Sequence, residues 1–307
     1  MTNPVDMIKY TPVSDAHRAA ALVMLVSQEP ESERVGRIAT IAAALRCGKL
    51  PENTLLAAIR GEQLVGVTWG QILPGKTALV WPPRVVEGEG EEIAYQLLLH
   101  LENELPPAGI RMAQAVLTDG SNPDARRLLR AGYTHAADLL YLLCQLERCE
   151  ASSTGLEIDF VPYDDKQRSR LAGLVERTYV NTLDVPALDG IRDINDVLRG
   201  YEQTGEFVAD RWFFIQRQGT DVGCLLLNDH PAEQQWELVY LGIVPEARGH
   251  GWGEQATRFA QSLARRAGRK RLILAVDATN DPAVSAYTKA GFFEVLRRSV
   301  FLKIFAV

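Results

Sequence analysis

A run rich in arginine and glycine, Arg248-Gly249-His250-Gly251-Trp252-Gly253, is the part of the sequence best suited to hold a charged ligand. Glycine has no Cβ atom, so the backbone can turn sharply there and lie close to a ligand. A helix predicted to start directly after the run would direct its unpaired N–H groups and its positive dipole end toward it. This construction is typical of phosphate-binding sites, although a tight turn that merely uses glycine would have the same composition.

The elements on either side would hold this run in place. Residues 237–244 are almost entirely apolar and rich in Val, Leu and Ile, which predicts a buried strand that Pro245 ends. Residues 272–276 predict a second buried strand. Between them, apolar residues recur at helical spacing up to Gly268, a glycine typical of the position after a helix. That apolar stripe consists of Ala256, Phe259, Ala260, Leu263, Ala264 and Ala267.

The spacing of the glycines excludes two common phosphate loops. A Walker loop ends in Gly-Lys-Ser/Thr, and a dinucleotide fingerprint has glycine where this sequence has Arg248. The pattern Arg-x-x-Gly-x-Gly instead resembles the pyrophosphate loop of the GNAT superfamily of N-acetyltransferases. Residues 280–292 resemble the second signature of that superfamily, Asn-x-x-Ala-x-x-x-Tyr-x-Lys-x-Gly-Phe. Both patterns occur in the expected order, with a predicted strand between them.

The resemblance implies that acetyl-coenzyme A is the co-substrate. Main-chain groups of Leu241, Gly242 and Ile243 would bind its acetyl and pantetheine parts at a splayed strand end. Asn280 would bond the pantetheine arm, although the same side chain could cap the following helix. The pyrophosphate would be held by the residues of the loop, namely Arg248, Gly249, His250, Gly251, Trp252, Gly253 and Glu254.

Two side chains are candidates for the proton transfers that acetyl transfer to an amine requires. Tyr287 matches the tyrosine of the superfamily that protonates the departing thiolate; the alternative is a core aromatic residue. Glu237, eleven residues before Arg248, is a lone carboxylate in an apolar run, and burial would raise its pKa into the range of a general base. The alternatives for Glu237 are a solvated residue at a strand edge, or a base made of water molecules.

The acceptor side of the site is less distinct. In the superfamily the segment between the first two helices lines it, here residues 181–196. This segment holds Asp184, Asp189, Asp193 and Asp196 but only one arginine, Arg192. It could form an acidic mouth that attracts a cationic amine, but helix capping and turn formation favour the same residues, and we prefer this second interpretation.

The order of predicted elements repeats after a small polar stretch, residues 150–155, which predicts domains 1–150 and 151–307. The repeat resembles tandem GNAT proteins, the mycothiol synthases among them, in which the second copy carries out the chemistry. The first copy has Val85 in place of the loop arginine and Leu128 in place of the tyrosine. Glu87, Glu89, Glu91 and Glu92 crowd its turn and would repel a pyrophosphate. We therefore expect a degenerate first copy.

Composition narrows the remaining possibilities. A chain of 307 residues, 47% hydrophobic and 23% charged, is an ordinary globular protein long enough for two domains. The net charge of −6 gives no reason to expect nucleic acid. The four cysteines and five histidines show no metal-ligand spacing, so we expect no metal. With no basic leader and no apolar run long enough for a bilayer, we expect a cytoplasmic protein.

Together these features predict a two-domain α/β protein with a mixed central sheet in each half. We expect its C-terminal half to be an N-acetyltransferase that transfers the acetyl group directly to an amine of a small molecule or peptide, within a ternary complex. One alternative is a module that senses acyl-coenzyme A without catalysis. Transfer of another acyl group, or transfer to a hydroxyl, also remains open.

Overall fold

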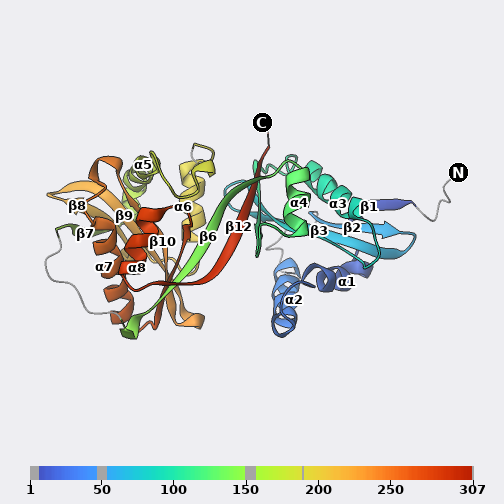
Figure 1. The fold of residues 1–307 in the computed structure, drawn as a ribbon, viewed down its shortest axis with the longest axis horizontal. Coiled ribbons are helices and arrows are strands. Elements are labelled where there is room, and N and C mark those ends of the chain that lie inside the picture. Colours follow the sequence, from blue (N-terminus) through green and yellow to red (C-terminus); the bar gives the residue numbers. More distant parts are fainter. Residues whose placement is uncertain (1–6, 47–53, 149–156, 189, 306–307) are drawn as a thin grey trace. The chain divides into compact units, whose positions relative to one another are not determined.

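The computed structural model describes residues 7–46, 54–148, 157–188 and 190–305. The chain forms two compact units, one of Met1–His135 with Val300–Val307 and one of Ala136–Ser299, called unit 1 and unit 2 below. Each unit is a mixed sheet flanked by helices, as Figure 1 shows, so the predicted fold class is confirmed.

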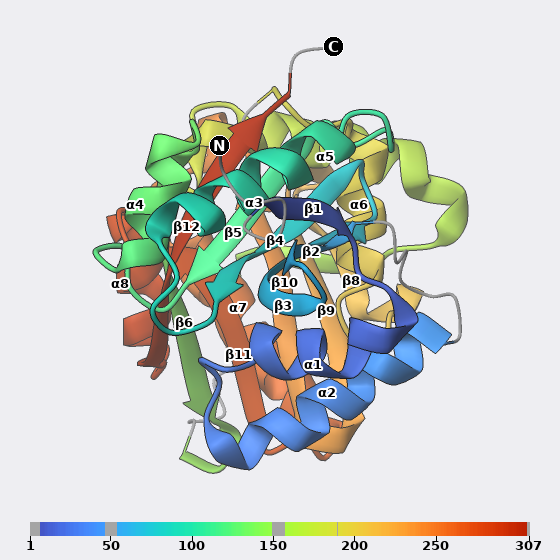
Figure 2. The same ribbon diagram turned by 90° about the vertical axis from the view of Figure 1, so that its right-hand side faces the viewer.

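Unit 1 is an antiparallel sheet extended by one parallel strand. Its elements are β1 (Ile8–Pro12), α1 (Asp15–Leu25), α2 (Glu31–Arg46), β2 (Leu55–Arg60), β3 (Gln63–Leu73), β4 (Thr77–Val85), α3 (Glu91–Glu104), β5 (Met112–Leu117) and α4 (Pro123–Arg130). Strands β1 to β4 pair antiparallel in sequence order, and β5 pairs with β4 in parallel. The leucines of α3 pack on one face of the sheet, while α1 and α2 cover the other (Figure 2).

Unit 2 repeats this order of elements. It contains β6 (Thr134–Gln145), β7 (Asp159–Pro162), α5 (Arg168–Tyr179), α6 (Ile194–Glu202), β8 (Trp212–Arg217), β9 (Thr220–His230), β10 (Gln235–Ile243), α7 (Trp252–Arg266), β11 (Arg271–Asp277), α8 (Asp281–Lys289) and β12 (Phe293–Ile304). The strand order within the unit is β12-β6-β11-β10-β9-β8-β7. Ala256, Ala260 and Ala264 of α7 are fully buried, so the predicted apolar stripe is the packed face of that helix.

Two strands belong to units other than those their sequence position suggests. From Ala136 onward β6 lies in unit 2, where it pairs antiparallel with β11. The end of β12 returns to unit 1, where the Phe305 N–H donates to the Arg111 carbonyl at 2.9 Å. The predicted linker at 150–155, and with it the boundary between 1–150 and 151–307, lies outside the described residues. The chain divides into its two compact units at 135/136 and 299/300.

The helices and strands predicted around the glycine-rich run are confirmed. β10 ends at Ile243, α7 starts at Trp252 and β11 covers the run expected at 272–276. Gly268 has φ +74° directly after the C-cap of α7, which is the left-handed geometry expected there. Across the described ranges, none of the helices combines the length and the apolar character that crossing a bilayer demands.

Candidate active site

The backbone of the candidate site is set by two parallel strands that diverge. β10 and β11 pair only over Gln235–Glu237 and Arg271–Ile273. Beyond that point β10 stays paired with β9 up to Ile243↔Gly223, and β11 stays paired with β6 up to Asp277↔Leu139. The facing edges of the two strands are therefore not bonded to each other, and the predicted splayed strand end is confirmed. Leu241, Gly242 and Ile243 lie on the diverging part of β10.

A glycine turn connects the diverging end of β10 to α7. Gly249 and Gly251 have φ of +84° and +76°, a region that residues with a Cβ rarely adopt, and Gly251 is the N-cap of α7. The amides of residues 249–254 have no hydrogen-bond acceptor within the described part of the chain. Several N–H groups at the positive end of a helix thus remain available to an anion.

The side chains of this turn interact with other residues of the protein. The Arg248 guanidinium donates to the carbonyls of Thr178 and Val180 at the end of α5 (2.9 and 3.0 Å), and also to those of Asn181 and Ile243. His250 stacks on the buried Trp252 ring with centroids 4.8 Å apart. Glu254 pairs with Arg258 at 2.9 Å. Any contact of these residues with a diphosphate would therefore come chiefly from the main chain.

Helix α5 packs directly on the diverging strand because β10 has a glycine at the contact. A methyl group on Gly242 would lie 2.6 Å from Thr178 Oγ1 and 2.8 Å from the Tyr240 hydroxyl. The Thr178 and Tyr240 hydroxyls are themselves hydrogen bonded at 2.7 Å. Gly242 is thus required for close packing of α5, in addition to the main-chain role expected of it.

Helix α8 brings Tyr287 and Asn280 to the end of β11. Tyr287 is 7% exposed and its ring centroid lies 5.8 Å from that of Phe292. Burial, and secondarily the negative charge of Asp184, raise the pKa of Tyr287, so its phenol keeps its proton. Asn280 is the N-cap of α8 and accepts from the Ala283 N–H at 3.3 Å, which supports the capping alternative for its side chain.

Glu237 has a partner that the sequence analysis did not assign. Its Oε2 lies 2.8 Å from His230 Nε2, and both side chains are 23% exposed. Glu237 is thus neither isolated among apolar residues nor fully solvated. The hairpin between β9 and β10, in which His230 pairs with Gln235, is the signal in the sequence that could have indicated this contact.

In the acidic segment before α6, the aspartates that the structure describes mainly form local hydrogen bonds and ion pairs. Asp193 caps α6 by accepting from the Asn195 N–H, and Asp196 pairs with Arg199. Asp184 accepts from the Asp277 N–H at 3.0 Å, while Asp277 accepts from the Val185 N–H at 3.1 Å, which ties the segment to the end of β11. Asp189 lies outside the described residues. These contacts favour the capping interpretation over an acidic mouth.

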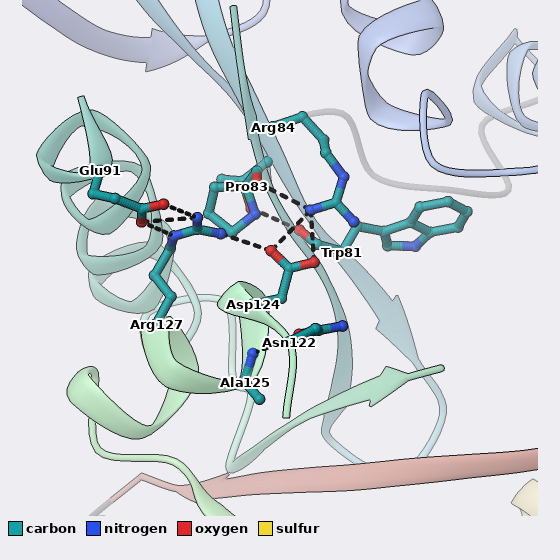
Figure 3. A network of polar contacts seen from close by, with 9 residues as sticks. Trp81, Pro83, Arg84, Glu91, Asn122, Asp124, Ala125 and Arg127 are labelled. Carbon is teal, nitrogen blue, oxygen red and sulfur yellow. Dashed lines mark hydrogen bonds and ion pairs between the residues drawn. The ribbon is translucent and has the colours of Figure 1, made fainter. Parts of the chain in front are cut away.

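Unit 1 also contains two parallel strands that diverge, and ion pairs lie beside the point where they separate. β4 and β5 pair in parallel only over Thr77–Leu79 and Met112–Gln114. Beyond this point Arg84 of β4 and Arg127 of α4 converge on Asp124 at 2.9 and 2.6 Å, as Figure 3 shows. Arg127 also pairs with Glu91 of α3 at 2.8 Å.

Two other glutamates near the turn of unit 1 form ion pairs within the unit, and the leucine that replaces the tyrosine is buried. Glu89 forms a bidentate pair with Arg60, and Glu92 pairs with Arg130 at 3.0 Å. Leu128, which occupies the position of Tyr287, is 1% exposed. Several side chains around the first turn are therefore paired with one another.

Comparisons with known proteins agree with this geometry. Residues 187–292 match the profile of the Acetyltransferase (GNAT) family. A mycothiol acetyltransferase of Amycolatopsis mediterranei is 27% identical over 208 residues, which cover 64% of this chain and 65% of that protein. One from Streptomyces bingchenggensis is 33% identical over 104 residues, covering 33% of this chain and 32% of that protein. The chain thus spans less than two thirds of the length of these relatives.

Solved structures share the fold over almost the whole chain. A GCN5-related N-acetyltransferase from Sphaerobacter thermophilus has a TM-score of 0.64 at 15% identity, covering 97% of this chain and 95% of that one. A tandem GNAT protein from the clavulanic acid biosynthesis pathway has a TM-score of 0.52 at 15% identity and covers 97% and 98% of the two chains. At these identities the likeness concerns the fold alone.

Proposed function

We propose that unit 2, in which residues 187–292 match the Acetyltransferase (GNAT) family, transfers an acetyl group from acetyl-coenzyme A to an amine. One observation carries the proposal: diverging strands lead into a glycine turn whose amides have no acceptor in the described part of the chain. Acetyl-coenzyme A fits this site because its diphosphate can accept from those amides. When bound, it supplies the acetyl thioester.

The roles of the chain's own residues follow from their positions. Main-chain groups of Leu241, Gly242 and Ile243 would bind the pantetheine arm and the thioester carbonyl along the diverging part of β10. Asn280 is proposed to contribute to pantetheine binding while it caps α8. The amides of residues 249–254 would hold the diphosphate, with the Arg248 side chain fixing the turn to α5.

The proton transfers are assigned to Glu237 and Tyr287. Glu237 would take a proton from the acceptor amine as its nitrogen forms a bond to the acetyl carbon. As the carbon–sulfur bond breaks, the Tyr287 hydroxyl would give its proton to the departing thiolate. Burial keeps the pKa of Tyr287 above its ordinary value, which supports a proton donor at neutral pH. Direct transfer of this kind requires both substrates on unit 2 at once.

We extend the proposal to unit 1, which we expect not to turn over acetyl-coenzyme A. The side chains near its turn are paired with one another, and the glutamates there would repel a diphosphate. Tight binding of acetyl-coenzyme A to a full-length protein whose second turn has been disabled would contradict this part of the proposal.

The test uses a charge placed in the turn of unit 2. A Cβ atom added at Gly253 would meet no atom within 4 Å outside its own stretch of helix, which leaves room for Gly253→Asp, and a carboxylate in the first turn favours the helix. It would nevertheless repel a diphosphate, and we expect acetyl-coenzyme A to bind about 10-fold or more weakly, which corresponds to about 1.4 kcal/mol. Gly253→Asn is the uncharged control of the same shape.

Two measurements complete the test. Calorimetry would give the affinity of each variant for acetyl-coenzyme A, and release of free thiol would report transfer to a panel of amines. The name of the relatives makes mycothiol without its acetyl group the first acceptor to assay. Equal affinities for the Asp and Asn variants would refute the binding site. If acetyl-coenzyme A binds but no free thiol is released with any of the amines, a module that senses acyl-coenzyme A would be favoured.

A further inference from the structure

His230 and Glu237 form a pair in unit 2, but the proposed function gives a role only to Glu237. His230 is the last residue of β9, and its Nε2 lies 2.8 Å from Glu237 Oε2 on β10. The second oxygen, Oε1, has no hydrogen-bond partner within the described part of the chain. A carboxylate with one bonded and one open oxygen is arranged to accept a proton at the open one.

The pair lies at the point where the strands diverge. Glu237 is the last residue of β10 that pairs with β11, opposite Ile273. A bulge between Leu238 and Tyr240 changes the alternation of β10, so Glu237 pairs with Asn228 and Tyr240 with Leu226. Because Asn228 and Leu226 are two residues apart on one strand, Glu237 and Tyr240 point to the same face of the sheet.

Contacts identify this as the face covered by α5 and α6. Asn228 Nδ2 donates to the Tyr201 and Thr204 carbonyls at the end of α6, at 2.6 and 2.5 Å. Tyr240 stacks on the Tyr201 ring of α6 with centroids 5.3 Å apart. Glu237 therefore faces the side of the sheet that carries the segment between α5 and α6, where we expect the acceptor.

The surroundings fix the imidazole of His230. A methyl group on Gly205 would lie 2.9 Å from both Cε1 and Nε2 of the ring, so the backbone at Gly205 packs closely against it. Asp229, the preceding residue, exchanges two backbone hydrogen bonds with Glu206, at 2.8 and 3.1 Å. Its carboxylate accepts from Arg269 at 2.6 and 2.7 Å. The ring is therefore held between residues that are closely packed or hydrogen bonded.

We propose that His230 is a positioning residue for Glu237. It donates its Nε2–H to Oε2 and so holds the carboxylate with Oε1 toward the acceptor amine. In the transfer step Oε1 takes the amine proton while the bond to His230 is kept, and the proton then leaves to solvent. This inference rests on the proposed function, since it assigns the orientation of the base proposed there.

The test compares two replacements of His230 in the full-length protein. His230→Ala removes the donor, and we expect kcat to fall about 10- to 100-fold while the KM for acetyl-coenzyme A changes less than about twofold. His230→Gln keeps an N–H donor at a similar distance from the backbone and should recover most of the rate. His100→Ala, in unit 1, is the control for loss of a histidine. In a Glu237→Gln background, His230→Ala should cause no further loss.

A spectroscopic measurement follows the pair independently of turnover. The ¹⁵N spectrum of the histidine rings should show His230 protonated at Nε2, assigned by loss of its signals in His230→Gln, and Glu237→Gln should shift these signals.

Normal kcat in His230→Ala beside a slow Glu237→Gln would overturn the positioning role alone, as would a ring protonated only at Nδ1. A full rate in Glu237→Gln would overturn the base and its positioning together. A wild-type protein inactive on every amine would instead refute the proposed function, while the spectrum would still test the pair.

Discussion

Replacing Gly251 by alanine tests whether the turn before α7 is shaped for an anion. Gly251 has φ +76° and a methyl group there would meet no atom within 4 Å, so the substitution adds strain but no collision. An L-residue in this region costs about 1 kcal/mol. To relieve that strain the chain would rotate the turn, which redirects the amides around position 251.

The structure provides a matched control at the other end of the same helix. Gly268 has φ +74° and equally open surroundings, so Gly268→Ala carries the same strain away from the candidate site. Both variants should lose about 1 kcal/mol of unfolding free energy, which lowers the melting temperature by about 2–4 °C. Thermal unfolding followed by circular dichroism would establish that the two losses are equal.

Only Gly251→Ala should affect the co-substrate. A hydrogen bond to a charged group contributes about 1.5–3 kcal/mol, so losing one well-placed amide should cost at least about 2 kcal/mol, or about 30-fold in affinity. Calorimetry with acetyl-coenzyme A would measure this loss, and KM should rise with it. If Gly251→Ala binds as tightly as Gly268→Ala, the amides of this turn do not hold the diphosphate and the reasoning fails.

Three further outcomes are expected. Tyr287→Phe keeps the ring but removes the hydroxyl, so kcat should fall about 100-fold while thermal unfolding and the affinity for acetyl-coenzyme A stay unchanged. Asp124→Ala leaves Arg84 and Arg127, which are 17% and 9% exposed, without their shared carboxylate. Arg127 keeps its pair with Glu91, so mainly Arg84 loses its partner and the free energy of unfolding should fall by about 1–3 kcal/mol, while the kinetics of acetyl transfer stay normal. The buried Tyr133 hydroxyl has no hydrogen-bond partner in the described chain, so Tyr133→Phe should raise the unfolding free energy by about 1 kcal/mol near pH 7. Burial raises the pKa of Tyr133 above its ordinary 10.0, so the wild type should lose stability as the pH rises above about 10, and Tyr133→Phe should lose less.

The elements around the glycine turn could be predicted because local sequence determines them. The buried strand before Pro245 and the apolar stripe of α7 are patterns within a few residues, and Gly268 marks a helix end by its backbone alone. The N-cap alternative for Asn280 follows in the same way. It recurs at the start of α4, where Asn122 accepts from the Ala125 N–H at 2.9 Å.

Contacts between distant segments could not be predicted from such patterns. The pairing of β6 with β11 depends on which of two similar sheets accepts a strand, and the sequence of β6 alone suits either. The Arg248 guanidinium reaches the end of α5, about seventy residues away in the chain, so its motif did not indicate where its donors go. The contact between His230 and Glu237 depends on the register of β9 against β10.

The two units share a backbone arrangement at this place but differ in the side chains around it. In both, a parallel strand pair diverges after three residues, at Leu79 in unit 1 and at Glu237 in unit 2. In unit 1, arginines and carboxylates from the strand and the following helices neutralise one another there. In unit 2 the Arg248 guanidinium donates instead to main-chain carbonyls at the end of α5. Because the diverging strands are common to both units, we expect any difference in anion binding between them to come from these side chains.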